Sequence, residues 1–208
     1  MKYTYKLEEL DNSNVKEVGG KNASLGEMFS SLASKGIRVP DGFATSAKCY
    51  WEYLEKNDLK EDIEELLSNL DSDNLENLED TSGKIREKIM EGQIPEEIEK
   101  EIKKAYEALK EREKKLGSVA VRSSATAEDL PDASFAGQHE SYMNIRGMDQ
   151  LLKAWKKCVA SLFTDRAIKY RLENGFEHMK VALSVGVQKM VRSDKASSGV
   201  MFTIDTET

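Results

Sequence analysis

The sequence contains few of the residues that build metal sites and disulfide frameworks. Cysteine and histidine occur only twice each among its 208 residues. Cys49 and Cys158 lie in apolar, helix-like segments, and neither has a CxxC partner or a histidine at a metal-binding spacing. We therefore expect no metal ligands in this chain, two buried free thiols, and a reducing compartment, which favours the cytoplasm.

Long apolar segments and an excess of basic charge are also missing. No apolar run approaches the roughly 20 residues of a membrane-spanning helix, and the first residues lack the apolar core of a secretory signal. Lysine and arginine number 31 against 38 aspartate and glutamate residues, a net charge of −7. This balance argues against nucleic acid or an anionic membrane as a partner.

The sequence also shows no recognisable group of catalytic residues. No spacing indicates a Ser-His-Asp triad, a carboxylate pair or a metal cluster. His139 and His178 have no partner residue at an informative spacing, so we expect both to be surface histidines rather than acid–base groups or phosphohistidines. The sequence therefore points to binding segments rather than to a nucleophile.

Hydrophobic periodicity predicts helices in the first half of the chain. We expect the first long helix to begin just after Lys21 and to end near Gly36, with Asn22 or the pair Ser24 and Glu27 as its cap. Further helices are predicted around residues 50–54, 59–70, 75–89, 95–109, 151–162 and 164–173. The apolar face of the first helix is predicted to consist of Leu25, Met28, Phe29 and Leu32.

Strand patterns come mainly after Gly117. Residues 119–122 form a short apolar run, and residues 181–188 alternate as in a half-buried strand. A turn at residues 193–195 leads to residues 199–204, which we expect to pair with the preceding strand as a hairpin. The fold class predicted is α+β, with a mainly helical portion at residues 1–117 and a sheet-containing portion at residues 118–208.

Two glycines and a lysine, Gly19-Gly20-Lys21, stand directly before the first predicted helix. The glycines allow a tight turn, the helix N-terminus attracts anions, and the lysine adds a mobile positive charge. The spacing is not that of a Walker A loop. An ordinary glycine-rich turn with a solvated lysine explains this segment equally well, so it does not identify a phosphate site by itself.

The segment from Val121 to Tyr142 is a second candidate. Arg122 ends an apolar strand, where its planar guanidinium could bind phosphate oxygens in a bidentate manner, and small residues suited to close backbone approach follow it. The alternative is a surface loop in which Arg122 pairs with Glu128 or Asp129. A loop of this length is more often functional than decorative, so we favour a ligand-binding role.

Gln188 is a weaker candidate. Its amide could bind the edge of an adenine ring, but an exposed glutamine on a half-buried strand is the commoner situation.

Several long stretches together resemble the phosphoenolpyruvate synthase family, the pyruvate, water dikinases. The resemblance runs from Val18 to Thr208, and pyruvate phosphate dikinases and rifampin phosphotransferases share this kind of nucleotide domain. The loop SSATAEDLPDASFAGQ is also similar to the rifampin enzymes, whereas the first and last stretches favour the synthases. The stretches that carry the resemblance are VGGKNASLGEM, VPDGFATSA, AVRSSATAEDLPDASFAGQ, SLFTDRAIKYR and VGVQKMVRSDKASSGVMFTIDTE.

The resemblance implies the first lobe of an ATP-grasp-like domain, in which ATP lies between two lobes. It also implies that Lys21 and Arg122 act in catalysis by contacting the phosphates. The residues that it assigns to ATP are Lys21 and Arg122 at the phosphates, Gly137, Ser141 and Tyr142 along the nucleotide, and Gln188 near the base.

In this family a phosphoryl group passes from ATP to a histidine on a mobile domain and then to pyruvate, giving phosphoenolpyruvate, AMP and phosphate. Neither His139 nor His178 matches the phosphohistidine motif. The resemblance places the Mg²⁺ ligands in a second ATP-binding lobe, beyond this sequence, together with the phosphohistidine and pyruvate-binding domains.

The last residues, up to Thr208, follow a strand pattern directly, so we expect a chain cut from a longer polypeptide. Such a piece should be inactive alone and bind ATP weakly. A second hypothesis is a rifampin-type antibiotic phosphotransferase, and a third is a nucleotide-binding module without catalysis.

Overall fold

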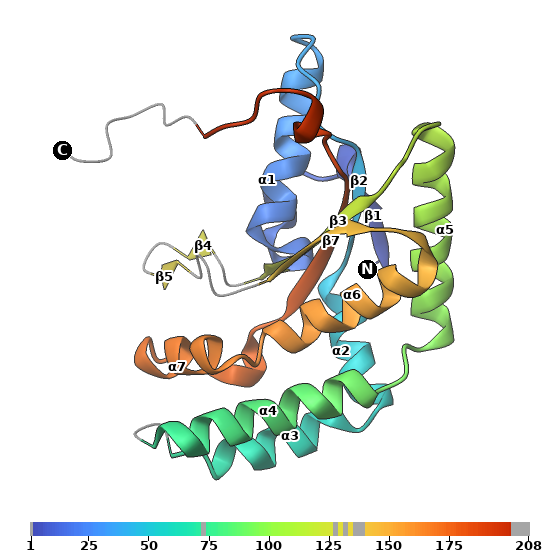
Figure 1. The fold of residues 1–208 in the computed structure, drawn as a ribbon. Helices are drawn as coiled ribbons and strands as arrows, with labels where there is room; N and C mark the ends of the chain where they lie inside the picture. The colour runs from blue at the N-terminus through green and yellow to red at the C-terminus, as the bar shows by residue number, and fades with distance from the viewer. Residues whose placement is uncertain (1, 72–73, 127–128, 131–132, 135–139, 201–208) are drawn as a thin grey trace, which may run out of the picture.

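The computed structural model describes residues 2–71, 74–126, 129–130, 133–134 and 140–200. A five-stranded antiparallel sheet forms its centre, with helix α1 on one face and helices α2, α5 and α6 on the other (Figure 1). Helices α3, α4 and α7 pack outside this second layer. The helices are α1 (Val15–Ala33), α2 (Ala47–Lys56), α3 (Leu59–Ser68), α4 (Leu75–Glu91), α5 (Glu96–Arg112), α6 (Gly147–Ser161) and α7 (Asp165–Glu173).

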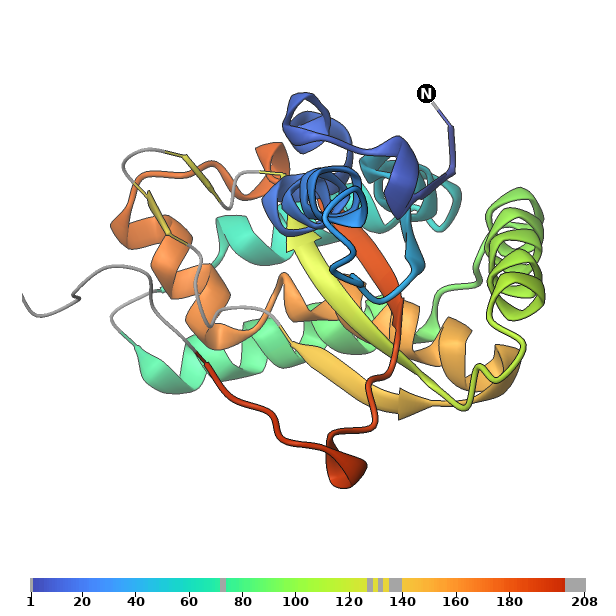
Figure 2. The ribbon, with the colours of Figure 1, turned by 90° about the horizontal axis from the view of Figure 1, so that it is seen from above.

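The main sheet has the strand order β1-β2-β7-β3-β6. Seen from above, α1 is viewed nearly end-on and lies next to β3 and β7 (Figure 2). The α+β class and the mainly antiparallel sheet are thereby confirmed, and β1 and β2 show that the first 117 residues also supply strands. The strands are β1 (Thr4–Lys6), β2 (Gly42–Thr45), β3 (Val119–Ala125), β6 (Ser141–Ile145) and β7 (Leu183–Lys189), and a separate pair is formed by β4 (Asp129–Leu130) and β5 (Ala133–Ser134).

Strand β7 is the centre of the sheet. Residues 185–188 pair with β2 on one edge, and residues 183–189 pair with β3 on the other. Both edges of β7 are already hydrogen-bonded, so β7 has no free edge for the predicted hairpin partner at residues 199–204, of which residues 201–204 lie outside the described residues. The predicted half-buried character is wrong: residues 183–187 are buried, since α1 covers one face of the strand and α6 the other.

Helix α1 differs from its prediction mainly in its buried face. A first turn begins at Val15, but the helix is broken at Gly19 and continues from Gly20, close to the predicted start; neither Asn22 nor Ser24 caps it. The predicted large apolar residues are only partly covered, and Met28 is 42% exposed. Small residues lie against the sheet and the preceding segment instead, because a side chain at Gly26 would collide with Leu10. The buried residues of α1 are Val18, Gly19, Gly20, Asn22, Ala23 and Gly26.

The opposite face of the sheet carries the large hydrophobic core. Trp155 of α6 is 1% exposed, packs edge-on against Tyr53 with ring centroids 5.3 Å apart, and donates its indole N–H to Thr45 Oγ1 at 3.1 Å. Both cysteines are buried free thiols in this core, as predicted, and burial raises the pKa of Cys49 to about 12. Within the residues described, no helix is both long and apolar enough to cross a membrane.

The expectation for His178 is wrong, and His139 lies outside the described residues. His178 is half-buried, and its Nδ1 accepts a hydrogen bond of 2.8 Å from Nε of Arg171. Arg171 is fully buried beside Tyr50 and Phe163. Desolvation, reinforced by the charge of Arg171, lowers the pKa of His178 to about 4.

Candidate functional site

Helix α1 is interrupted at Gly19, whose φ of 72° and ψ of 162° lie outside the helical region. Only glycine adopts such a backbone conformation readily. A β-carbon there would stand 2.6 Å from the carbonyl oxygen of Ser124 and 2.7 Å from that of Ala125, so the break lies directly against strand β3. A new helical segment therefore begins at Gly20, and the positive end of its dipole lies over the sheet.

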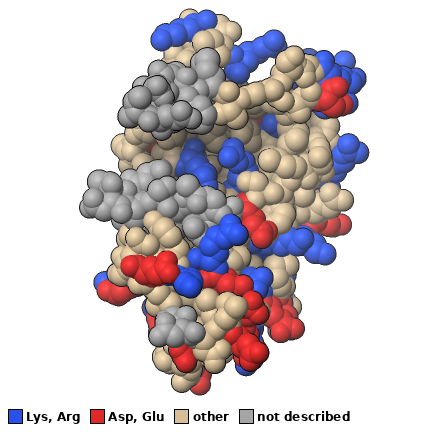
Figure 3. Space-filling view, turned by 60° about the vertical axis from the view of Figure 1, so that its left-hand side comes forward, with Lys and Arg blue, Asp and Glu red and all other residues tan. Residues whose placement is uncertain are grey.

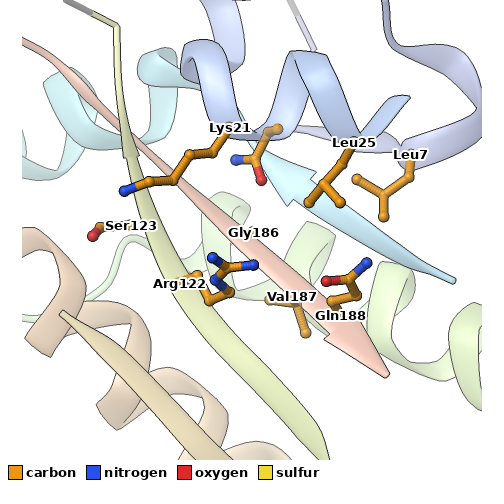
Figure 4. A pocket seen from close by; sticks show the side chains of 9 residues that line it. Leu7, Lys21, Leu25, Arg122, Ser123, Gly186, Val187 and Gln188 are labelled. Atoms are coloured by element: carbon orange, nitrogen blue, oxygen red, sulfur yellow. The ribbon is translucent and has the colours of Figure 1, made fainter. Parts of the chain in front are cut away.

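Lys21 and Arg122 line one hollow at this restart of the helix, although they are far apart in the sequence. Figure 4 shows Lys21 reaching from α1 over β7 toward β3, while Arg122 rises from β3 into the same space. Both side chains are half-buried. On the side of the molecule that faces left in Figure 1, basic side chains gather in a hollow (Figure 3).

No acidic residue of the described chain lines this hollow. Its floor has room for about one water molecule, so a larger ligand would rest across its mouth. Two cations that share a small space repel each other, and an anion bound between them would relieve that repulsion. The arrangement is therefore suited to phosphate groups. The lining residues are Leu7, Lys21, Asn22, Leu25, Arg122, Ser123, Gly186, Val187 and Gln188.

Gln188 lies at the other end of the same hollow, below Leu7 and Leu25 (Figure 4). Its Nε2 donates to the carbonyl oxygen of Pro40 at 3.0 Å, which fixes the orientation of the amide. Gln188 is half-buried rather than exposed. The structure thus brings three of the predicted site residues, Lys21, Arg122 and Gln188, into one place.

A larger cavity of about 720 Å³ lies farther along α1, next to Pro40. Its volume is typical of pockets for small organic ligands. Phe29 stands eight residues after Lys21 on α1, about 12 Å along the helix axis. The residues that line the cavity include the apolar side chains of Phe29, Ala33, Ile37, Val39, Pro40, Met190 and Val191.

Ser141 and Tyr142 are neighbours on β6 and face opposite sides of the sheet. Ser141 pairs with Arg122 and so shares its face, whereas Tyr142 pairs with Val121 and lines a separate hollow beside α6. Lys157 of α6 stands 5.3 Å from the centre of the Tyr142 ring. The structure does not bring Tyr142 to the Lys21–Arg122 hollow, and Gly137 lies outside the described residues.

The acids proposed as partners of Arg122 are Glu128, outside the described residues, and Asp129, whose side chain is not described. Sequence patterns did not reveal the structural role of Asn22, a buried residue whose side chain donates a hydrogen bond to Ser184 Oγ at 2.9 Å. Gly186, an isolated glycine inside a strand, was the available signal of a close approach at this point.

Comparison with known proteins gives a consistent result. Residues 15–208 match the family described as pyruvate phosphate dikinase, AMP/ATP-binding domain. The phosphoenolpyruvate synthase of Helicobacter pylori is 56% identical over 209 residues, which cover 100% of this chain and 26% of the relative. That of Pseudomonas aeruginosa is 52% identical over 207 residues, with 100% and 26% coverage. That of Escherichia coli is 50% identical over 199 residues, with 96% and 25% coverage.

The chain therefore spans about a quarter of the length of the curated relatives it matches. The match to the family extends from just before the break in α1 to the last residue. It includes both basic residues of the hollow and the whole of the central strand β7. This chain belongs to the pyruvate phosphate dikinase AMP/ATP-binding domain family.

Proposed function

We propose that this chain is the ATP-binding part of a phosphoenolpyruvate synthase and holds the phosphates of ATP between Lys21 and Arg122. The observation that carries the proposal is the hollow in which these two cations meet at a helix N-terminus, with no acid of the described chain in its lining. Lysine supplies a compact charge and arginine a planar fork, and together they suit a polyphosphate.

The base of ATP would lie toward Gln188 and the neighbouring cavity. Gln188 ends the hollow and is held by Pro40, which also lines the cavity. The apolar side chains of the cavity suit the faces of a flat heteroaromatic ring, and the spacing along α1 suits the length of a nucleotide. We include Ser141 because it shares the face of Arg122. Gly137 and Tyr142 stay predictions from the resemblance alone.

Phosphoryl transfer depends mainly on positioning and on neutralising negative charge. Lys21 and Arg122 could do both for ATP without forming a covalent bond. The resemblance places the Mg²⁺ ligands in the second lobe of an ATP-grasp-like domain, and we propose the same for this protein.

The whole protein would convert pyruvate to phosphoenolpyruvate with ATP and water, through a phosphohistidine on another domain. The named relatives support this assignment because they are phosphoenolpyruvate synthases about four times as long as this chain. None of the relatives described above is a rifampin phosphotransferase, so that alternative is not favoured. We place the protein in the cytoplasm.

Calorimetric titration of the chain with Mg-ATP tests the proposal. We expect weak binding that Lys21→Ala and Arg122→Ala each reduce at least about tenfold, because either change leaves one cation facing the phosphates. Arg122→Lys should recover part of the loss, since it keeps the charge without the planar fork. Unfolding free energies should stay within about 0.5 kcal/mol of the unsubstituted chain, because neither side chain is fully buried.

Lys16→Ala is the matched control, since Lys16 is an exposed lysine on the same helix. It should leave the affinity for ATP unchanged. Equal affinities in the unsubstituted chain and in both Lys21→Ala and Arg122→Ala would refute the assignment of the site.

A further inference from the structure

Asn22 occupies an unusual place for a polar residue. It follows Lys21 directly, and it is only 2% exposed. Its Nδ2 donates to the carbonyl oxygen of Val18 at 3.1 Å and to Ser184 Oγ of β7 at 2.9 Å. Its backbone N–H donates to Ser124 Oγ of β3 at 3.4 Å. One residue therefore joins the two sides of the Gly19 break and fastens the restarted helix to two strands.

The strand below leaves room for this side chain. A β-carbon on Gly186 would overlap Asn22 Oδ1, so a glycine is needed at this position of β7, where the Asn22 amide packs. Gly186 of β7 lies directly opposite Arg122 of β3, and both positions face α1. The amide of Asn22 is thus seated beside the strand position from which Arg122 enters the hollow.

The hydrogen bonds continue through the sheet to its far side. Ser184 Oγ donates to the carbonyl oxygen of Thr45 at 2.6 Å, and Thr45 Oγ1 accepts the indole N–H of Trp155 at 3.1 Å. All of these side chains are buried. Buried polar groups are costly unless they are bonded, so this chain of bonds resists movement of Asn22 relative to the main core.

We infer that Asn22 is a positioning residue that holds Lys21 opposite Arg122 for phosphate binding; this rests on the proposed function. Two cations in one hollow repel each other, and a lysine side chain is long and flexible. The bonds of Asn22 fix the backbone from which Lys21 reaches over the hollow. The network therefore tunes the affinity for phosphate groups in addition to the stability of the fold.

The test is an NMR titration of the isotope-labelled chain with ATP and with inorganic tripolyphosphate. Asn22→Ala should weaken the binding of both ligands about tenfold. ATP-induced shifts of the Lys21 resonances should decrease, whereas those at Gln188 and Val191 persist, because only the phosphate end is disturbed. A purely structural role would reduce the shifts at both ends together.

Asn57→Ala is the matched control. Asn57 also bonds a carbonyl four residues earlier, that of Tyr53 at 2.8 Å, and a distant segment, Gln93 O at 2.9 Å, but it lies at the end of α2. Its loss should lower stability without changing the affinity for ATP. Ser184→Ala, which removes one partner of Asn22 and no lining residue of the hollow, should weaken ATP binding about threefold.

Ser184→Ala keeps the inference testable if Asn22→Ala does not fold. Unchanged ATP affinity in the folded variants, while the unsubstituted chain binds, would overturn the inference alone. An absence of ATP-induced shifts in the unsubstituted chain would overturn the proposed function and the inference with it.

Discussion

The two faces of the central sheet are built from different kinds of residues. On the face toward α6, strand residues such as Val121 and Val185 pack in one extensive core with large side chains that include Trp155 of α6. The face toward α1 carries small and polar residues, among them Ser124, Ser184 and Gly186, together with a small apolar cluster. Large interlocking side chains stabilise a fold, whereas small ones let backbones approach closely.

We expect this difference to separate the residues that stabilise the fold from those that bind ATP. The α6 face supplies most of the buried apolar surface, and so most of the favourable free energy of folding. The α1 face buries less apolar surface and carries two cations, Lys21 and Arg122, around one hollow. Substitutions on the first face should change stability most, and substitutions on the second should change binding most.

The largest effect on stability is expected from the α6 face. Trp155→Ala should lower the free energy of unfolding by about 3–5 kcal/mol, because it leaves a large cavity and removes the bond to Thr45. Urea unfolding followed by circular dichroism measures this. Met28→Ala, at a large apolar residue of α1 that is 42% exposed, should cost no more than about 0.5 kcal/mol. Comparable losses in the two variants would remove the distinction between the faces.

Gly19→Ala is expected to have the next largest effect. The new β-carbon would meet the backbone of β3, and the backbone conformation itself disfavours alanine by about 1–3 kcal/mol. ATP binding should be lost as well, because Lys21 would shift with the helix. Gly36→Ala is the control, since Gly36 has a similar φ of 74° but no atom within 4 Å of its β-carbon position. If both variants retain ATP affinity, the close contact at Gly19 is not needed for binding.

A pH-dependent effect concerns the buried Arg171 and its partner His178 on the α6 side. The pKa of His178 is about 4 in the folded chain and about 6.5 in an unfolded one. The unfolded chain therefore takes up the proton first, so stability is complete above pH 6.5 and falls as the pH drops toward 4. Protonation also turns Nδ1 into a donor that faces Arg171 Nε, a donor itself.

Urea unfolding at several pH values between 7 and 4, with His178→Gln as the comparison, measures this dependence. The variant should lose the part of the acid sensitivity that His178 contributes, while the remaining titrating groups act in both proteins. Identical slopes of stability against pH in the two proteins would show that His178 does not couple to folding.

Sequence patterns predicted the helices well where periodicity and end signals agree. Helix α7 is an example, since Thr164 accepts the N–H of Ala167 as its cap. Strands β1 and β2 were not predicted. They have only three and four residues, and they are stabilised by pairing with segments that are distant in the sequence. The hairpin prediction has a related weakness: a local pattern cannot tell which strands already occupy the edges of β7.

The candidate site was predictable in part. The glycines and Lys21 were equally consistent with an anion site and with an ordinary turn, and the Arg122 segment favoured a ligand-binding role. Only the fold shows that Lys21 and Arg122 share one hollow. Periodicity searches for large apolar residues, so the small buried face of α1 and the role of Asn22 were not detected. Ser141 and Tyr142 are neighbours on a strand and face opposite sides of the sheet, so their shared place along the nucleotide stays a prediction from the resemblance.

The central claim is that ATP binds to the α1 face of the sheet, with its phosphates between Lys21 and Arg122. An ATP titration followed by the backbone amide resonances of the isotope-labelled chain tests it directly. We expect the largest shifts at residues 19–22, 122–123 and 186–191, with little change around Trp155 on the opposite face. Shifts confined to the α6 face, or unchanged amides of Lys21 and Arg122 at saturating ATP, would contradict it.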